Sequence, residues 1–275
     1  MSEPDIVGHY ARDDLLSRLK AALADDGVDP ERPTIETLAP YDQFHGRGLE
    51  ATTELADLLT VAAADHLLDV GSGIGGPARY LADRFGCRIT GIDLTAEFCD
   101  LARHLTELLG LGDQLSFEEG DALAMRFAEE SFDGAYSVNV SMNIADKAGL
   151  YREIRRALKP GGWLVLSELA KGPGGALDYP TPWARSAESS FLATPEETRA
   201  GLETAGFAIE SWRDTRQAAL DFGARSRELV ERGEKPPHRA IQLMHGEIAP
   251  AAMANVARGL AEERIIPIEI FCRKS

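Results

Sequence analysis

The sequence predicts an α/β fold built on a parallel sheet that has helices on both faces. From residue 67 onward, short apolar runs alternate with amphipathic stretches of helical length, an order typical of parallel strands joined by right-handed crossovers. The first apolar run ends in an acid and a group of glycines, Gly71, Gly73, Gly75 and Gly76, and a helical pattern follows at once. With 275 residues, of which 44% are hydrophobic, the chain is long enough to bury a sizeable core.

Seven stretches have the length and apolar character of strands. The fifth follows Lys159-Pro160-Gly161-Gly162, which ends a helix and turns the chain into the strand. The last contains Pro267, which cannot donate to a ladder, so we expect an edge strand or a strand end there. The predicted strands are residues 67–70, 88–92, 115–118, 134–138, 163–169, 207–212 and 265–272.

Apolar residues at helical spacing predict the helices, and the gaps between them predict the domain organisation. We expect residues 1–60 to form a helical cap that contributes to the active site and residues 61–275 to form the core. Residues 170–194 have little periodicity, so a functional loop is expected there. This loop and the helical insertion 215–262 are the predicted lid. The predicted helices are residues 13–24, 49–60, 75–85, 96–109, 147–158, 195–205, 215–232 and 251–262.

The composition excludes several classes of protein. A formal net charge of −16 argues against nucleic-acid and anionic-membrane partners, because both select basic surfaces. Cys87, Cys99 and Cys272 lie apart with no CxxC spacing, which indicates reduced thiols and no metal site. The first residues do not resemble a signal peptide, and no run reaches the ~20 apolar residues of a membrane span. We therefore expect a cytoplasmic location.

The glycine stretch is a candidate nucleotide site. Gly71-x-Gly73-x-x-Gly76 satisfies the dinucleotide fingerprint, but by itself it does not separate NAD from other adenosine ligands. Asp93 lies 20 residues beyond Gly73, at the end of the second strand, where a carboxylate can accept both ribose hydroxyls. Asp121, after the third strand, could accept from an adenine amino group, and this arrangement is less typical of dinucleotide folds.

Five motifs in the right order and spacing carry a family resemblance: Leu68-Asp-Val-Gly-Ser-Gly-Ile-Gly-Gly, Gly91-Ile-Asp-Leu, Gly120-Asp-Ala, Ser131-Phe-Asp and Leu158-Lys-Pro-Gly-Gly. With them the chain resembles the class I S-adenosylmethionine-dependent methyltransferases. More narrowly, it resembles a small-molecule branch that includes sarcosine/dimethylglycine and tocopherol methyltransferases. The resemblance implies a Rossmann-like seven-stranded mixed sheet, mostly parallel, whose last strand is antiparallel and lies between strands five and six.

The resemblance also implies which residues bind the cofactor, S-adenosyl-L-methionine, and its product S-adenosyl-L-homocysteine. Asp69 would order the turn, and Gly71, Ser72 and Gly73 would lie under the methionine part. Asn139 falls near the amino-acid end of the cofactor and the mouth of the acceptor site. Relatives in this branch tend to carry histidine there, so this departure removes one candidate base.

At the adenosine end, the implied contacts come from the ends of strands two and three. Asp93 would bind the ribose hydroxyls, and Leu94 would pack on the adenine. Asp121 and the backbone N–H of Ala122 would read the adenine edge. Ordinary roles as a strand-end acid and a turn acid are the alternatives for Asp93 and Asp121.

Five residues are candidates for the acceptor side of the reaction. Tyr41 and His45 would bracket the methyl group, with His45 as general base or substrate orienter; a structural histidine is the alternative. Asn143 would hold a polar group of the acceptor, or else cap a turn. Trp183 would close over the acceptor, or else anchor the loop. Arg47 would bind a carboxylate, or else pair with the acidic surface.

These observations favour an enzyme (EC 2.1.1.-) that moves a methyl group to a nitrogen or oxygen atom of a small molecule by in-line displacement. An NAD-linked oxidoreductase is the first alternative, disfavoured by Gly120-Asp-Ala and by the absence of a Tyr-x-x-x-Lys pair. A non-catalytic cofactor-binding protein of the same fold is the second. The expected partner is a small-molecule methyl acceptor, and a homodimer is left open.

Overall fold

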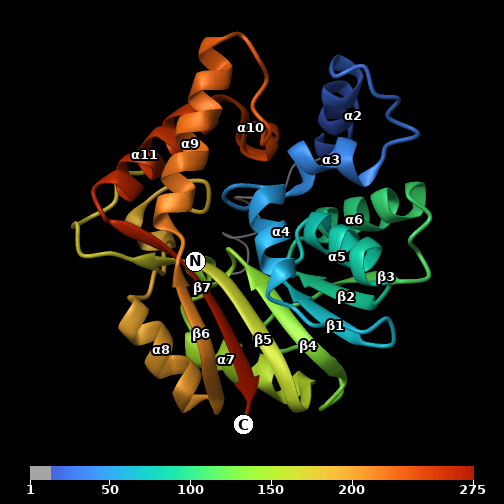
Figure 1. Cartoon of the computed structure of the whole chain (residues 1–275), viewed down its shortest axis with the longest axis vertical. Helices are drawn as coiled ribbons and strands as arrows, with labels where there is room; N and C mark the ends of the chain where they lie inside the picture. Colours follow the sequence, from blue (N-terminus) through green and yellow to red (C-terminus); the bar gives the residue numbers. More distant parts are fainter. Residues whose placement is uncertain (1–13) are drawn as a thin grey trace.

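The computed structural model describes residues 14–275 and shows one seven-stranded sheet with helices on both faces (Figure 1). The strand order is β3-β2-β1-β4-β5-β7-β6, and only β7 runs antiparallel, pairing with both β5 and β6. The predicted Rossmann-like mixed sheet is therefore confirmed. The strands are β1 (His66–Val70), β2 (Arg88–Asp93), β3 (Leu115–Glu119), β4 (Phe132–Val138), β5 (Leu158–Lys171), β6 (Phe207–Asp214) and β7 (Ile265–Lys274).

The helices follow the predicted alternation within a few residues. The first thirteen residues of the predicted cap, including Asp13 of the predicted helix 13–24, lie outside the described part of the chain. The α-helices are α2 (Leu15–Asp25), α3 (Ile35–Asp42), α4 (Leu49–Asp57), α5 (Gly76–Phe85), α6 (Ala96–Leu108), α7 (Lys147–Ala157), α8 (Pro195–Thr204), α9 (Arg216–Glu231), α10 (Ala240–His245) and α11 (Ala249–Ala261).

Successive residues of the central strands face opposite sides of the sheet, and helices cover both sides, so these strands carry buried apolar side chains on both faces. Leu67 packs with α4, α5 and α6 on one face, and Leu68 packs with α7 and α8 on the other. Both side chains are fully buried. The two helical layers therefore fix the sheet from both sides and leave its carboxyl edge for a site.

Two helices were not predicted. The helix α3 contains Pro40, and Pro33 precedes it, so the sequence pattern predicts a break in the chain there instead of a helix. Proline is tolerated here because the helix is short and starts with a strong cap: the Thr34 side chain accepts from Thr37 N–H, and Thr37 returns the bond. The helix α10 has only six residues, too few for a clear periodicity.

Of the two interpretations of Pro267, the edge strand is wrong, because β7 lies inside the sheet between β5 and β6. Pro267 is near the start of β7, opposite Leu169 of β5 and one residue outside the ladder with β6. Its carbonyl accepts from Thr215 N–H on the β6 side. The proline nitrogen lies on that same side, past the end of β6, so the missing N–H breaks no ladder bond.

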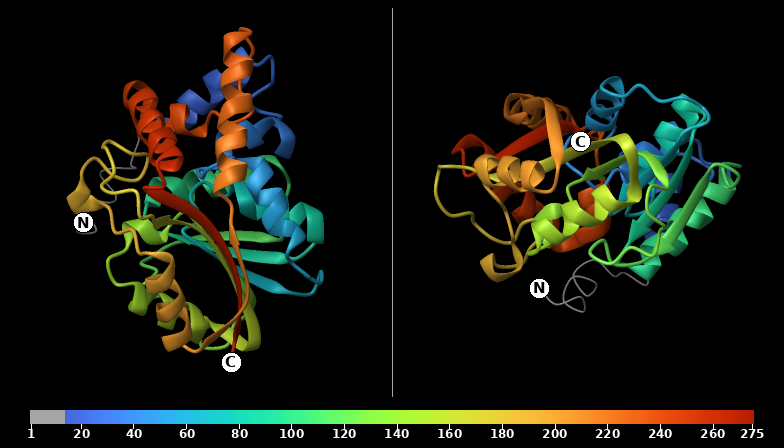
Figure 2. Two further views of the ribbon diagram at one scale, coloured as in Figure 1. Left: turned by 60° about the vertical axis from the view of Figure 1, so that its left-hand side comes forward. Right: turned by 90° about the horizontal axis from the view of Figure 1, so that it is seen from below.

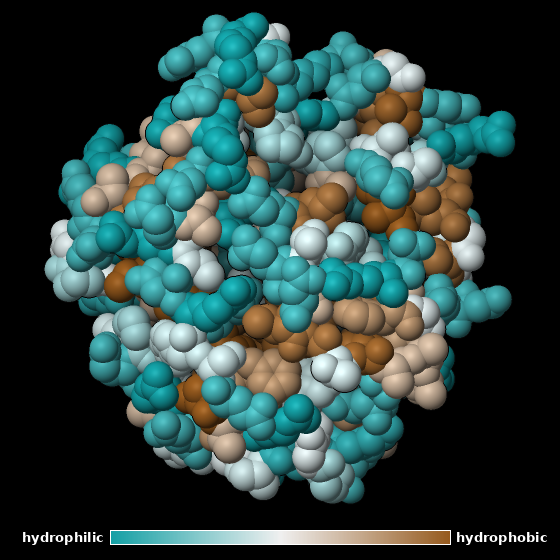
Figure 3. Space-filling model, in the orientation of Figure 1, coloured by the Kyte–Doolittle hydropathy of each residue, from teal (hydrophilic) through white to brown (hydrophobic). Residues whose placement is uncertain are grey.

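Two groups of helices stand over the carboxyl edge of the sheet. The cap helices α2 and α3 pack on α6 and α10, through residues such as Leu38 and Leu243. The helices α9 and α11 rise beside them, and the loop after β5 packs against their base through Trp183 (Figures 1 and 2). The surface over these elements is mostly hydrophilic, with hydrophobic side chains mainly in a band across the middle of the face drawn in Figure 3.

Candidate functional site

The turn between β1 and α5 is shaped by glycines in left-handed conformations. Gly71 and Gly73 have φ of 75° and 52°. A Cβ on Gly71 would overlap the side chain of Val140, whereas a Cβ on Gly73 would meet only Phe44, at 3.6 Å. The first glycine therefore lets two loops approach closely, and the second leaves open space above the turn for a ligand.

Three acids at strand ends surround this turn. Asp93 accepts from Gly73 N–H at 2.8 Å, which fixes the turn, and burial raises the pKa of its carboxyl group. Asp69 is 3% exposed, burial raises its pKa to about 7, and its Oδ2 has no hydrogen-bond partner among residues 14–275. Asp121 accepts from Leu123 N–H at 2.8 Å and keeps its second oxygen available.

These residues line a cavity of about 340 Å³, which we call the turn cavity. The nine residues expected to contact the cofactor all lie on its wall, and so does Asn143, which was expected on the acceptor side. The structure thus brings together segments that are up to 70 residues apart in the sequence. The nine are Asp69, Gly71, Ser72, Gly73, Asp93, Leu94, Asp121, Ala122 and Asn139.

A second cavity of about 290 Å³, the lid cavity, lies between the cap, the loop after β5, and the helices α9 and α11. Arg47 and Trp183 line it, as expected for the acceptor side. Its wall is mostly apolar and includes three methionines, whose flexible side chains suit an irregular ligand. The apolar side chains include Met142, Leu169, Trp183, Leu220, Phe222, Ile241, Met244, Met253, Val256 and Leu260.

The two cavities share Phe44, His45 and Asn139. Asn139 directly follows β4 in a left-handed conformation, with φ of 55°, which is unusual for a residue with a side chain. With the amide oriented to satisfy both contacts, its oxygen accepts from Gly46 N–H and its nitrogen donates to the Ser167 carbonyl, each at 3.3 Å. Asn139 therefore fastens the cap to the sheet where the cavities meet.

His45 is placed at this junction, but its ring is occupied by the protein. Nδ1 lies 3.1 Å from the Gly46 carbonyl, and Nε2 lies 3.0 Å from the Thr52 hydroxyl and 3.2 Å from the Gln43 amide oxygen. Burial lowers the pKa of His45 to about 4, so the ring is neutral near pH 7. These contacts give His45 a fixed orientation and leave neither nitrogen open.

Tyr41, the other expected catalytic residue, lies outside both cavities. Its hydroxyl donates to Asp26 at 2.7 Å, and the Arg239 guanidinium lies over its ring, 4.6 Å from the centroid. Tyr41 and Leu38 are three residues apart on α3 and both pack toward α2. The structure therefore places Tyr41 in the packing of the cap.

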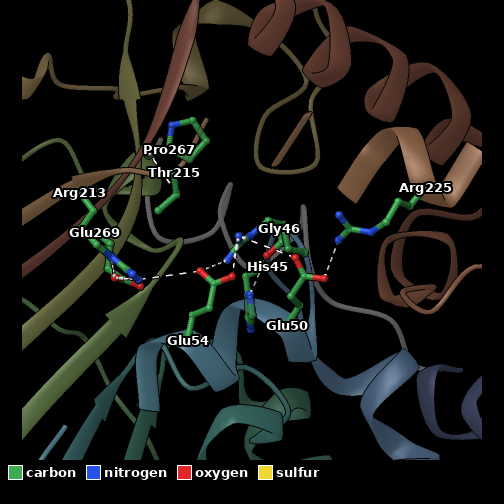
Figure 4. A network of polar contacts seen from close by, with 10 residues as sticks. His45, Gly46, Glu50, Glu54, Arg213, Thr215, Arg225, Pro267 and Glu269 are labelled. Atoms are coloured by element: carbon green, nitrogen blue, oxygen red, sulfur yellow. Dashed lines mark hydrogen bonds and ion pairs between the residues drawn. The ribbon is translucent and has the colours of Figure 1, made fainter. Parts of the chain in front are cut away.

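Arg47 lines the lid cavity but is already paired with Glu54, which Figure 4 shows near Arg213 and Glu269. It donates to both carboxylate oxygens of Glu54, at 3.1 and 2.7 Å. Glu54 lies 3.8 Å from Arg213, which is also paired with Glu269 on β7. From the same helix, Glu50 pairs with Arg225 of α9 at 2.7 Å. Arg47 thus belongs to a charged network that joins α4 to β6, β7 and α9.

Trp183 is 3% exposed, and its indole N–H donates to the Ser190 hydroxyl at 2.9 Å. The ring therefore forms a fixed part of the wall of the lid cavity. The same loop carries the only isolated bridge of the described chain, between Thr181 and Ala184. Both contacts hold the indole in place.

Two residues that line the lid cavity were missed by the sequence reasoning. Glu168 is 3% exposed, accepts from Ser141 N–H at 3.1 Å, and has its pKa raised by burial to about 7. An acid inside an apolar strand was a visible signal for it. His238 follows two prolines in a segment without periodicity, and no local pattern marked it.

Two further searches cover the described residues only. No helix within residues 14–275 is long and apolar enough to cross a membrane. Within the same range, no group of three or more His, Cys, Asp or Glu side chains is arranged to hold a metal ion.

Comparison with known proteins identifies a methyltransferase domain within the chain. A family model described as "Methyltransferase domain" matches residues 68–166. Among curated proteins, the chain is 39% identical over 114 residues to a sterol 24-C-methyltransferase of Eremothecium gossypii, which covers 42% of this chain and 31% of that protein. The chain therefore spans less than two thirds of the length of the curated relatives that it matches first.

Solved structures share the fold over nearly the whole chain. A geranyl diphosphate methyltransferase in complex with GPP and sinefungin has a TM-score of 0.71 at 17% identity and covers 99% of both chains. The [4+2]-cyclase SpnF has a TM-score of 0.67 at 23% identity and covers 95% of this chain and 93% of its own. Such identities show the fold alone. The sequence match shows a methyltransferase domain over residues 68–166, and the solved structures show that the chain as a whole has the fold of S-adenosylmethionine-dependent methyltransferases.

Proposed function

We propose that the protein transfers a methyl group from S-adenosylmethionine, bound in the turn cavity, to a nitrogen or oxygen atom of a small, largely apolar molecule in the lid cavity. The observation that carries this proposal is the junction of the two cavities at Phe44, His45 and Asn139. In-line displacement requires the acceptor atom roughly 3 Å from the methyl carbon and opposite the leaving sulfur. Two cavities that meet end to end suit that geometry.

The residues of the turn cavity fit this methyl donor. Asp69 lines the turn cavity, where its carboxylate would accept from the ammonium group of the donor. The open space over Gly73 admits a ligand close to the backbone, and Asp93 keeps lone pairs for ribose hydroxyls. The bound donor would supply an electrophilic methyl group on a sulfonium.

For the acceptor side we propose roles from the contacts of each residue. His45 orients the acceptor and does not take its proton, because hydrogen bonds with the protein engage both ring nitrogens. Trp183 forms an apolar wall, and Arg47 shapes the cavity through its pair with Glu54. Asn143 lines the turn cavity and is proposed near the donor.

The proposed division of the chain follows from the same cavities. Residues 1–60 act as a cap, residues 61–275 as the core, and residues 170–194 and 215–262 as a lid. Support comes from the lid cavity, whose wall is drawn from the cap, the loop after β5 and the helices α9 to α11. Formation of a homodimer is left open, and the sedimentation coefficient of the protein can test it.

Calorimetry with S-adenosylhomocysteine and with NAD tests the donor. We expect micromolar binding of the first and none of the second; the reverse would refute the proposal. A methyl-labelled donor assayed against phenols, amines and terpenoid alcohols tests transfer. Binding without transfer to any of these acceptors would instead support a non-catalytic protein, or a reaction such as that of the cyclase of the same fold.

A further inference from the structure

His238 lies between α9 and α10 and lines the lid cavity. Its Nε2 is 2.8 Å from the backbone carbonyl oxygen of Gln43, in the cap. Because a carbonyl oxygen can only accept, Nε2 must carry the proton. In the neutral ring, Nδ1 then holds the free lone pair.

The packing of the ring shows which edge is open. A Cβ on Gly48 would lie 2.8 Å from Cδ2 of His238, so the edge formed by Cδ2 and Nε2 faces the cap. Nδ1 is on the opposite edge, because it and Cδ2 are the two neighbours of Cγ. No residue within 14–275 forms a hydrogen bond with Nδ1. The ring of Phe222, from α9, contacts the imidazole at a centroid distance of 6.4 Å.

His238 lies close to the junction of the two cavities. Phe44 and His45 follow Gln43 directly in the sequence. These two residues line the turn cavity as well as the lid cavity. His238 also acts electrostatically on His45 and lowers its pKa. The Gln43 carbonyl therefore holds the imidazole beside the cap segment that lines both cavities.

The surroundings keep the imidazole neutral. Burial lowers the pKa of His238, and the charge of Arg239 lowers it further, while the Gln43 carbonyl raises it. A neutral imidazole near pH 7 is able to take a proton. Arg47 and Arg225, on neighbouring elements, are paired with Glu54 and Glu50. The other charged or titratable side chains that line the lid cavity with His238 are His45, Glu168, Arg227, His245 and Glu269.

Two other groups at the lid cavity are less suited to this role. Hydrogen bonds engage both nitrogens of His45. Both carboxylate oxygens of Glu168 accept from the Ser141 N–H, at 3.1 and 3.2 Å, which holds that side chain against the turn after β4. His238 alone of these three has a fixed tautomer and an unengaged acceptor atom within the described part of the chain.

We propose that Nδ1 of His238 is the proton acceptor for the methyl acceptor's O–H or N–H group, an inference that rests on the proposed function. His238 removes the proton while the lone pair of the acceptor atom forms a bond to the methyl carbon. The carbon–sulfur bond breaks, and its electron pair stays on sulfur. The positive charge of the sulfonium is thereby replaced by that of the imidazolium, which returns its proton to solvent.

The test compares His238→Gln with wild type. Glutamine can still donate toward the Gln43 carbonyl, but it cannot take a proton. With the best acceptor among phenols and terpenoid alcohols, we expect kcat to fall by about 100-fold to 10,000-fold. The dissociation constant of S-adenosylhomocysteine and the melting temperature should not change. His104→Gln, on α6 and away from both cavities, is the matched control, and it should keep the wild-type kcat.

The pH profile separates a proton acceptor from a structural histidine. Wild-type kcat should rise with pH to a plateau, and the apparent pKa of this rise should lie below that of a free histidine. In the variant, this pH-dependent rise to a plateau should be lost. Free imidazole should restore part of the rate to His238→Ala. A variant with an unchanged pH profile, or a loss of the plateau in His45→Gln alone, would overturn the proposal.

Nitrogen NMR of the protein with ¹⁵N-labelled histidine, bound to S-adenosylhomocysteine, tests the geometry without an acceptor. We expect His238 to be neutral and protonated on Nε2 at pH 7. A ring protonated on Nδ1, or on both nitrogens, would overturn the inference even if methyl transfer is found. Failure to bind S-adenosylhomocysteine would instead count against the proposed function.

Discussion

The ion pair between Arg79 of α5 and Asp42 of α3 joins the cap to the helix that follows the glycine turn. Arg79 Nη2 lies 2.9 Å from Asp42 Oδ2, and the two side chains are 0% and 2% exposed. The Gln43 amide donates to the other carboxylate oxygen at 3.0 Å. Arg79→Met would leave a buried carboxylate without its cation, and Asp42→Leu would leave a buried guanidinium without its anion.

The magnitude follows from this burial. Removing one partner of a buried pair costs about 3–5 kcal/mol, because the other charge stays desolvated and unpaired. For a domain of this size, about 2–4 °C per kcal/mol gives a fall in melting temperature of roughly 6–20 °C. The double variant, with apolar side chains at both positions, should recover most of the loss, since no unpaired charge remains.

Urea unfolding and melting temperatures of wild type, both single variants and the double variant would measure these effects. Arg84→Met provides a matched control on the same helix, because Arg84 pairs with Asp57 while the side chains are 34% and 61% exposed. We expect that control to lose far less stability than either single variant, because solvent screens the exposed pair. Single variants as mild as the control, or a double variant as unstable as the sum of the singles, would refute the reasoning.

Three further predictions concern the site itself. Gly71→Ala should abolish binding of S-adenosylhomocysteine in calorimetry, because its Cβ would overlap Val140; retained binding would contradict the close approach. Asn139→Ala should be less stable than Asn139→Gly by about 1 kcal/mol, because φ is positive there, and both should lower kcat by releasing Gly46. Burial raises the pKa of Glu168 to about 7, above its unfolded value, so this residue makes wild-type stability fall as the pH rises through that range. Glu168→Gln should therefore gain roughly 3 kcal/mol relative to wild type between pH 4 and 8, and parallel pH curves would refute this.

The cofactor side of the site could be predicted because its signals are local. A glycine turn after a strand and an acid at the next strand end are both readable in a few residues, and parallel topology brings strand ends to one edge. The nine expected residues accordingly line one cavity. The position of β7 came from the family resemblance, since Pro267 in isolation left an edge strand open.

The acceptor side could not be predicted, because contacts between distant segments create it. Tyr41 lies in a segment rich in glycine and aromatic residues, but the rotation of α3 turns it toward Asp26. No pattern near His238 indicates its bond to the Gln43 carbonyl, 195 residues away in the sequence. The Thr34–Thr37 capping box was the one local signal for α3, and Pro40 obscured it.

The place of β7 in the sheet has a consequence for synthesis on the ribosome. Within the sheet, β6 pairs only with β7, so β6 has no strand partner until residues 265–274 have left the exit tunnel. The glycine turn and the parallel ladders that join β1 to β5 are formed by residues up to 171. A nascent chain can therefore assemble its nucleotide-binding half early, whereas the chamber for the acceptor forms after β7 is inserted. The acceptor chamber is thus incomplete in an emerging polypeptide until β7 is in place.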